Sequence, residues 1–264
     1  MKKFLFLMLL ILITGCGENR EYGVFIGIDS ERISKLSTYK TVVIEPENFT
    51  KEEVEHLKSQ GKEVYAYLNI GALEEYRYYY DRYRKYELGA YENWDDEVWI
   101  DVSKKEWQFF LVNDLGKKYK DKGFDGFFID NADVYYHYQD EKIYQGLVEI
   151  LKGLKENGSK IIINGGDVFV SRVLYEASDT QIFDAVNQET VFTSINFSEK
   201  TYGRSSDESR EYFCEYLKKV KDSGKEVYLL EYSPDFFTKM EIKKYCEEND
   251  MKYFISPDLS LTND

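Results

Sequence analysis

The segment Gly126-Phe-Phe-Ile-Asp130 is apolar up to its last residue, a carboxylate, and Asn131 follows it directly. Its length and its aromatic and β-branched residues are typical of a buried strand. Because side chains alternate along a strand, Gly126, Phe128 and Asp130 share one face. Asp130 is therefore expected to point inward at the carboxyl end of the strand, whereas Asp125, at the other end, is expected to be structural.

Seven further runs of the same kind recur along the chain and alternate with amphipathic, charged segments. The runs cover 24–29, 41–45, 64–69, 160–164, 184–188, 227–231 and 253–256, and the helical patterns include 51–60, 104–122, 141–157, 209–223 and 235–249. Near-continuous apolar strands between helices predict a buried parallel sheet. Eight repeats of this unit predict a single-domain α/β fold, a (β/α)8 TIM barrel over residues 22–264. An open doubly wound sheet is the alternative.

The long segment between the third and fourth runs holds a ninth strand-like run, Val98-Trp-Ile-Asp-Val102. Together with residues 76–94 it predicts an insertion that crosses the mouth of the barrel. Such an insertion could also cover the mouth.

The first residues have the layout of a secretory signal. Two lysines precede an apolar run from Phe4 to Ile13, which at about ten residues is too short to span a bilayer comfortably. Small residues before Cys16 fit a bacterial lipobox, in which the cysteine is lipidated and becomes the new amino terminus. We therefore expect residues 1–15 to be a lipoprotein signal peptide and 16–21 a lipidated cysteine and tether. This predicts an extracytoplasmic, membrane-anchored protein of the bacterial cell envelope. The alternative is a cleaved signal with an incidental cysteine.

The chain is strongly acidic, with a formal net charge of −14. Removal of residues 1–15 would take away two lysines and no acid, which gives 33 − 49 = −16. An acidic surface repels nucleic acid, so nucleic acid is not an expected partner, and it mildly favours a cationic polymer. It can equally be a solvated surface that keeps the protein soluble.

Metal and redox motifs are scarce. Cys214 and Cys246 lack C-x-x-C spacing and do not indicate zinc, and the sequence leaves open whether they form a disulfide. His56 and His137 are isolated, so we expect neither a metal nor a cofactor. The sequence does not determine the oligomeric state.

Polar side chains gather at the carboxyl ends of the predicted strands, the face on which TIM barrels build active sites. Glycoside hydrolysis commonly uses two carboxyl groups on opposite sides of the scissile bond, while amides and hydroxyls hold the sugar. Any one of these residues could instead cap a helix, but their occurrence on at least five strands favours a common site. The positions are Asp29, Glu45, Asn69, Asp130 with Asn131, Asn164, Gln188 with Glu189, and Glu231.

Several of these motifs, taken in order, resemble glycoside hydrolase family 114, the endo-α-1,4-polygalactosaminidase group. The most specific is Gly123-Phe-Asp-Gly-Phe-Phe-Ile-Asp-Asn-Ala-Asp133; the others are Tyr67-Leu-Asn-Ile-Gly71 with Glu74, Glu75 and Arg77, then Trp99-Ile-Asp101, Asn164 and Glu189. The resemblance runs over nearly the whole mature chain. It implies a (β/α)8 barrel and an endo-acting hydrolase of galactosamine-containing polysaccharides, related to the hydrolase part of Pel-polysaccharide processing proteins.

The resemblance points to Asp130 and Glu189 as the catalytic pair. Their separation discriminates between retention, at about 5 Å, and inversion, at roughly 6.5 to 9.5 Å, and the sequence does not decide which carboxyl is the acid. The chain departs from the family pattern at Asn69, where a small residue such as serine is expected, and at Glu231-Tyr232, in place of a frequent Asp-Tyr. The expected substrate-binding residues are Asp29, Tyr67, Asn69, Asn131, Asn164, Glu231 and Tyr232.

Two other functions remain open at this point. A non-catalytic surface lectin could use the same barrel to bind a glycan, since barrels host many functions. A metal-dependent polysaccharide deacetylase would need a metal triad, usually rich in histidine, and the two isolated histidines argue against it.

Overall fold

The computed structural model describes residues 20–177 and 180–262. The predicted signal peptide and the predicted lipidation site at Cys16 lie outside these residues. Arg20 and Glu21, predicted as the end of the tether, already belong to the first strand. Within the described ranges, no helix has the length and apolar character needed to cross a bilayer.

Eight parallel strands form the centre of the molecule, in the order β1-β2-β3-β7-β8-β9-β12-β13. They are β1 (Arg20–Phe25), β2 (Tyr39–Ile44), β3 (Glu63–Asn69), β7 (Gly126–Asp130), β8 (Lys160–Asn164), β9 (Ala185–Glu189), β12 (Glu226–Tyr232) and β13 (Lys252–Ser256). The two end strands meet through Phe25 of β1 and Phe254 of β13, whose ring centroids are 5.1 Å apart. The sheet is therefore a nearly closed barrel, which confirms the predicted fold and excludes the open doubly wound sheet.

The first strand lies earlier in the chain than the predicted run 24–29. In the parallel pairing with β2, Tyr22 lies opposite Thr41, and the strand ends at Phe25. The chain then turns at Gly27, where an added Cβ would lie 1.7 Å from the carbonyl oxygen of Ser260. Only glycine permits this close approach. Because the strand ends at Phe25, Asp29 lies beyond the strand rather than at its carboxyl end.

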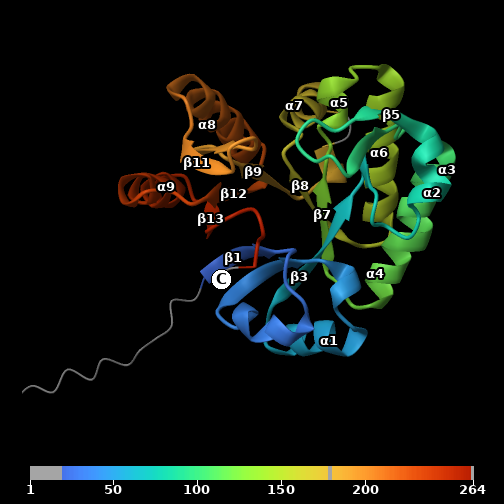
Figure 1. The fold of residues 1–264 in the computed structure, drawn as a ribbon, viewed down its shortest axis with the longest axis horizontal. Coiled ribbons are helices and arrows are strands. Elements are labelled where there is room, and N and C mark those ends of the chain that lie inside the picture. Colours follow the sequence, from blue (N-terminus) through green and yellow to red (C-terminus); the bar gives the residue numbers. More distant parts are fainter. Residues whose placement is uncertain (1–19, 178–179, 263–264) are drawn as a thin grey trace, which may run out of the picture.

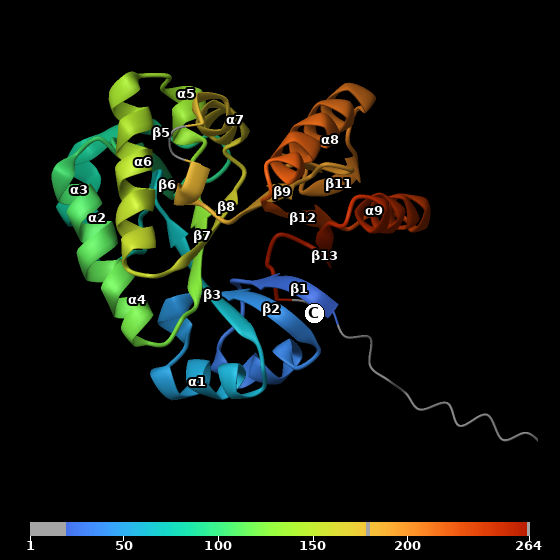
Figure 2. The ribbon, with the colours of Figure 1, turned by 180° about the vertical axis from the view of Figure 1, so that it is seen from behind.

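Helices surround the barrel on its outside, as the two opposite views show (Figure 1; Figure 2). They are α1 (Lys51–Ser59), a continuous run of α3 (Lys105–Phe109), a π-helical segment (Phe110–Gly116) and α4 (Lys117–Asp121), then α6 (Glu141–Glu156), α7 (Asp167–Glu176), α8 (Asp207–Asp222) and α9 (Phe236–Glu248). Between β1 and β2 the connection holds a 3₁₀ helix, Ser30–Leu36. Shorter 3₁₀ turns cover Pro46–Asn48, Arg84–Tyr86 and Thr180–Ile182.

Side-chain caps determine where several helices begin. Thr50 and Glu53 form a capping box at the start of α1, in which the Glu53 amide donates to Thr50 Oγ1 at 3.3 Å and the Thr50 amide donates to Glu53 Oε2 at 2.7 Å. Helix α8 begins at Asp207, earlier than predicted, because Ser206 is its cap and accepts the Ser209 amide at 3.1 Å.

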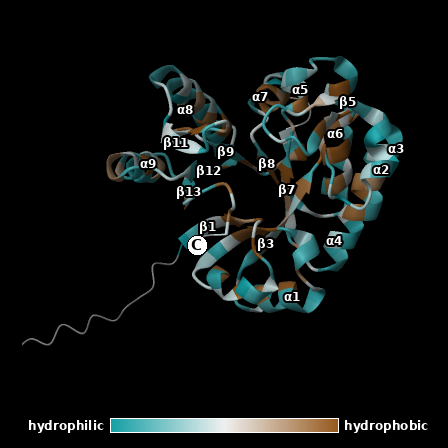
Figure 3. Ribbon diagram, viewed as in Figure 1, coloured by the Kyte–Doolittle hydropathy of each residue, from teal (hydrophilic) through white to brown (hydrophobic). Residues whose placement is uncertain are grey.

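The apolar side chains of the strands and of the inner helix faces form one core. Figure 3 shows the same arrangement, with brown, hydrophobic strands inside and teal, hydrophilic residues on the outer helices.

Asp125 and Asp184 brace the amino ends of neighbouring strands. Asp125 accepts the Val64 amide at 2.9 Å, and Asp184 accepts the Ile161 amide at 2.7 Å. Asp125 lies directly before the amino end of β7, at the other end of the strand from Asp130. Its hydrogen bond to the neighbouring strand is the structural role that the sequence predicted.

Two additions lie beyond the carboxyl ends of the strands. The first is a small antiparallel sheet of order β4-β6-β5, made of β4 (Ala72–Glu74), β5 (Glu87–Ala90) and β6 (Glu97–Ile100), with the short α2 (Tyr80–Tyr83) within it and α5 (Val134–His137) following β7. The second is the hairpin of β10 (Thr193–Asn196) and β11 (Thr201–Arg204), which the sequence did not predict. Trp94 of the first addition and Phe197 of the second meet with ring centroids 6.1 Å apart.

Candidate active site

The carboxyl ends of the strands open into a cavity of about 460 Å³, called here the catalytic cavity. Its floor comes from the ends of β3, β7, β8, β9 and β12, and its rim from the insertion between β3 and β7 and from the β10–β11 hairpin. The predicted insertion therefore contributes to the mouth, through residues such as Tyr76, Tyr91 and Trp94.

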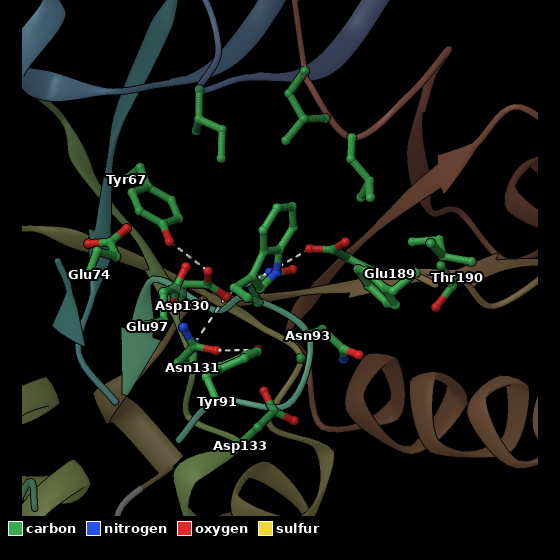
Figure 4. A pocket seen from close by; sticks show the side chains of 18 of the residues that line it. Tyr67, Glu74, Tyr91, Asn93, Glu97, Asp130, Asn131, Asp133, Glu189 and Thr190 are labelled. Atoms are coloured by element: carbon green, nitrogen blue, oxygen red, sulfur yellow. Dashed lines mark hydrogen bonds between the residues drawn. The ribbon is translucent and has the colours of Figure 1, made fainter. Parts of the chain in front are cut away.

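Asp130 and Glu189 point into this cavity from β7 and β9 (Figure 4). A single amide lies between them: Asn164 Nδ2 donates to Asp130 Oδ1 at 2.9 Å and to Glu189 Oε1 at 2.7 Å. Two contacts of these lengths to one nitrogen leave the nearest oxygens of the two carboxyl groups, Asp130 Oδ1 and Glu189 Oε1, less than about 6 Å apart.

Asn164 is itself held from inside the barrel. Asn187, fully buried, donates from Nδ2 to Asn164 Oδ1 at 2.6 Å, and the Tyr22 hydroxyl donates to Asn187 Oδ1 at 3.0 Å. These contacts orient the Asn164 amide so that its nitrogen faces the two acids. Side chains of β8, β9 and β1 together therefore fix the position of the amide that bridges the two acids.

Two tyrosines complete the contacts of the acid pair. Tyr67 donates to Asp130 Oδ2 at 2.8 Å, and Tyr232 donates to Glu189 Oε2 at 2.7 Å. The Asn131 amide adds a third donor to Asp130, at 3.0 Å. Each carboxyl group is thus hydrogen-bonded through both of its oxygens.

The environment raises the pKa of both acids. Burial raises the pKa of Asp130, while the donors Asn164, Tyr67 and the Asn131 amide pull it back down. Burial also raises the pKa of Glu189, and the neighbouring negative charge of Asp130 raises it further. Asp130 receives three donors that lower its pKa, whereas Glu189 receives two and carries the additional repulsion of Asp130.

Two further carboxyl groups of the cavity, which were not among the predicted site residues, have raised pKa values. Burial, with the charges of Glu74, Asp130 and Asp96, raises the pKa of Glu97 to about 8. Burial raises the pKa of Asp133 to about 7, against the lowering effect of the Gly166 amide that it accepts at 3.1 Å. Asp133 belonged to the quoted family motif, but Glu97 lies in the insertion, where no strand periodicity indicated it.

A buried ion-pair cluster supports one wall. Arg77 donates through both terminal nitrogens to Glu45, at 3.0 Å each, and from Nε to Glu74 at 2.7 Å. The Arg77 guanidinium thus forms ion pairs with two carboxylates that line the cavity. Glu74 also accepts from the Tyr76 hydroxyl at 2.9 Å, which fixes that ring at the rim.

The lining of the catalytic cavity is acidic. Its described lining residues include seven carboxylic acids and no lysine, arginine or histidine. The acids are Glu45, Glu74, Asp96, Glu97, Asp130, Asp133 and Glu189. Over residues 20–177 and 180–262, no group of three histidine, cysteine, aspartate or glutamate side chains is arranged to hold a metal ion.

The structure brings most of the predicted site residues together. The ones that line the cavity are Tyr67, Asp130, Asn131, Asn164, Glu189 and Tyr232. Asn131 additionally accepts from the Tyr91 hydroxyl at 3.1 Å. The other three predicted binding residues, Asp29, Asn69 and Glu231, are not part of the cavity lining.

Each of these three makes contacts within the protein. Glu231 is fully buried and accepts the Phe192 and Thr193 amides at 3.0 and 2.9 Å, so it holds the start of the β10–β11 hairpin. Asn69 is buried and accepts the Ala72 amide at 2.9 Å, which closes the turn after β3. Asp29 precedes the 3₁₀ helix after β1 and pairs with Arg32 at 3.6 Å.

Comparison with known proteins agrees with this geometry. The model of glycoside-hydrolase family GH114 matches residues 23–261. The uncharacterized protein MJ1477 of Methanocaldococcus jannaschii is 27% identical over 205 residues, which are 71% of this chain and 57% of that protein, so the chain spans little more than half of that relative.

Two solved structures have the same fold. The glycoside hydrolase domain of PelA from Pseudomonas aeruginosa has a TM-score of 0.78 at 18% identity, with 92% of this chain and 96% of that one covered. Aspergillus fumigatus Ega3, solved in complex with galactosamine, has a TM-score of 0.72 at 15% identity, with 93% and 94% covered. The family match over nearly all of the described chain confirms the resemblance seen in the sequence: the chain belongs to glycoside hydrolase family GH114 and is a glycoside hydrolase.

Proposed function

We propose that this protein cleaves an amino-sugar polysaccharide, containing galactosamine or N-acetylgalactosamine, within the chain. The observation that carries the proposal is the pair of acids bridged by one amide, Asp130 and Glu189 on either side of Asn164 Nδ2. Two carboxyl groups at this spacing are what glycosidic bond cleavage requires. The relative solved with galactosamine, Ega3, adds support for the class of sugar.

The two acids have different roles in this proposal. Glu189 is the general acid: it gives its proton to the glycosidic oxygen as the bond to C1 breaks. The Asp130 carboxylate attacks C1 and forms a glycosyl ester. Water then loses a proton to Glu189 and attacks C1, which frees Asp130 and restores the starting protonation state. The separation of less than about 6 Å supports this double displacement, with retention at the anomeric carbon.

The charge of the catalytic cavity supports a substrate that carries amino groups. Arg77 pairs with Glu45 and Glu74, and the other carboxyl groups of the lining attract a protonated amine and repel an acidic glycan. Glu97 stands out because burial, and then the neighbouring negative charges of Glu74, Asp130 and Asp96, raise its pKa to about 8, and a bound ammonium would offset those charges.

Release of reducing ends from partly deacetylated N-acetylgalactosamine polymer tests the proposal. The chain without residues 1–16 is compared with Asp130→Asn and Glu189→Gln, and with Asp125→Asn as a matched change at the other end of β7. We expect release by the wild type and by Asp125→Asn, if it folds, and a loss of at least about 10³-fold in both site variants. Normal activity of both site variants, or binding without release by the wild type, contradicts the proposal; the latter outcome is the lectin.

We further propose that the protein is anchored in the cell envelope through a lipid on Cys16. The support is the lysine-apolar-small-cysteine layout of the first sixteen residues. Incorporation of labelled fatty acid into the full-length protein, and its loss in Cys16→Ser, would support the anchor. Equal labelling of both would contradict it.

A further inference from the structure

A second cavity, of about 520 Å³, adjoins the catalytic cavity and is called here the side cavity. It is lined by α5, the start of α7, the first half of α8 and, from the insertion, residues 91–93 and Trp99. It shares Tyr91, Asn93 and Asp133 with the catalytic cavity, so the two lie next to each other. Asp133 lines both cavities, and Figure 4 shows it on the side of the catalytic cavity away from Tyr67. The volume of the side cavity is that of a site for a small molecule or a few sugar units.

Two tyrosine rings at the side cavity are open to solvent. Tyr136 of α5 is 57% exposed and Tyr212 of α8 is 50% exposed. A tyrosine offers an apolar ring face and a polar tip, which suits the mixed apolar and hydroxyl surface of a sugar ring. Two such rings on the wall of one cavity, close to the cleavage site, can stack against the sugar rings of a glycan.

A stack of rings leads from one cavity to the other. Tyr91, which lines both, stacks on Trp99 with centroids 4.4 Å apart, and Trp99 packs on His137 at 4.5 Å. Glu92 fixes this stack, since it accepts from Trp99 Nε1 at 3.2 Å and lies 3.3 Å from His137 Nδ1. The wall between the cavities is therefore held in place before any glycan binds.

The polar groups of the side cavity resemble those of the catalytic cavity in charge. Glu92, Asp133 and Asp167 contribute carboxyl groups, and no lysine or arginine is among its described lining residues. Asp167 accepts a hydrogen bond from the Tyr212 hydroxyl, which orients that ring. Carboxylates accept hydrogen bonds from sugar hydroxyls and from protonated amino groups alike.

We propose that the side cavity is a distal subsite that holds sugar units of the same polysaccharide several positions from the bond being cleaved. The inference rests on the proposed function, because the occupant is the continuation of the chain in the catalytic cavity. Longer chains then bind better than short ones, since only they reach Tyr136 and Tyr212. An enzyme that cleaves inside a polymer gains affinity from such a subsite without any change at the reacting atoms.

Binding in a catalytically inactive background tests the inference. Oligomers of galactosamine and N-acetylgalactosamine of increasing length are titrated calorimetrically into Glu189→Gln, with and without Tyr136→Ala and Tyr212→Ala. Loss of both rings is expected to weaken binding of long oligomers about three- to tenfold and to leave the shortest binding oligomer unchanged. Tyr175→Ala is the matched control, because Tyr175 is 90% exposed and belongs to neither cavity.

Two single variants keep the test decisive if the double variant folds poorly. Tyr136→Ala and Tyr212→Ala should each weaken the binding of long oligomers, whereas Tyr175→Ala should bind as the parent does. Equal affinity of all variants at every length would overturn the side-cavity inference and leave the proposed function intact. Failure of every variant, including the parent, to bind any oligomer would overturn both.

Discussion

Asn164 connects the two acids of the catalytic cavity, because its single amide nitrogen donates to both Asp130 and Glu189. The hydrogen bond lowers the pKa of each acid. Without it both pKa values rise, so Asp130 needs a higher pH to ionise and Glu189 keeps its proton to a higher pH.

Asn164→Ala should therefore move both limbs of the pH–rate profile to higher pH and lower kcat by about 10²- to 10³-fold. The matched variant Tyr67→Phe removes a donor from Asp130 alone. It should move the acidic limb and leave the basic limb in place. An unchanged kcat and profile in Asn164→Ala would show that the bridge has no part in the reaction.

The residues of β12 show how far the residues of the site could be predicted from the sequence. Tyr232 reaches Glu189, whereas Glu231 serves the amides of Phe192 and Thr193 on the opposite side of the strand. Side chains alternate along a strand, so these neighbours cannot both face the cavity. The alternation that placed Asp130 correctly would have corrected Glu231. Asn187, by contrast, is an inward residue of an apolar run, and nothing in the sequence distinguishes its role from packing.

At the scale of elements, the β10–β11 hairpin depends on one buried carboxylate. Glu231 accepts two amides and the Thr193 hydroxyl, the last at 2.6 Å. Ile195 and Phe197 of this hairpin line the catalytic cavity, so the hairpin must be held for the mouth to keep its shape. A glutamine at this position would turn an NH₂ group toward a donor.

Glu231→Gln should lower the free energy of unfolding by about 1 to 3 kcal/mol, because one buried donor loses its acceptor. Chemical denaturation measures this, and activity per folded molecule should stay within a few-fold of the wild type. Full stability together with lost activity would instead show that Glu231 acts on the substrate.

The strands and most helices could be predicted because each carries its own periodic signal, as in Gly126–Asp130 and Glu141–Glu156. The additions at the mouth could not, since short strands such as β4 and β10 take their shape from pairing with distant segments. Glu97 illustrates the consequence: it is an acid in an irregular charged stretch, and only the pairing of β6 with β4 places it in the cavity.

At the scale of the whole molecule, the acids of the catalytic cavity raise one another's pKa values. Burial and the charges of Glu74, Asp130 and Asp96 raise the pKa of Glu97 to about 8, so Glu97 is neutral below this pH and ionised above it. Ionised Glu97 attracts a protonated amine, whereas neutral Glu97 does not. The cavity therefore becomes more attractive to an amine as pH rises from 6 to 8.

Between pH 6 and 8, KM for the partly deacetylated polymer should fall in the wild type by about three- to tenfold more than in Glu97→Gln. Comparison with the variant removes the titration of the substrate amine from the difference. Glu149→Gln, at an exposed carboxylate outside both cavities, is the control and should follow the wild type. Parallel profiles for wild type and Glu97→Gln would exclude Glu97 from amine binding.

The central claim is that Asp130 and Glu189, held less than about 6 Å apart by Asn164, cleave an α-linked amino-sugar polymer by double displacement. Proton NMR of the first reducing ends, recorded before mutarotation, tests it most directly. The account predicts that the α-anomer appears first and that Glu189→Gln releases neither anomer. Initial appearance of the β-anomer, or no reducing ends from the wild type, would contradict it.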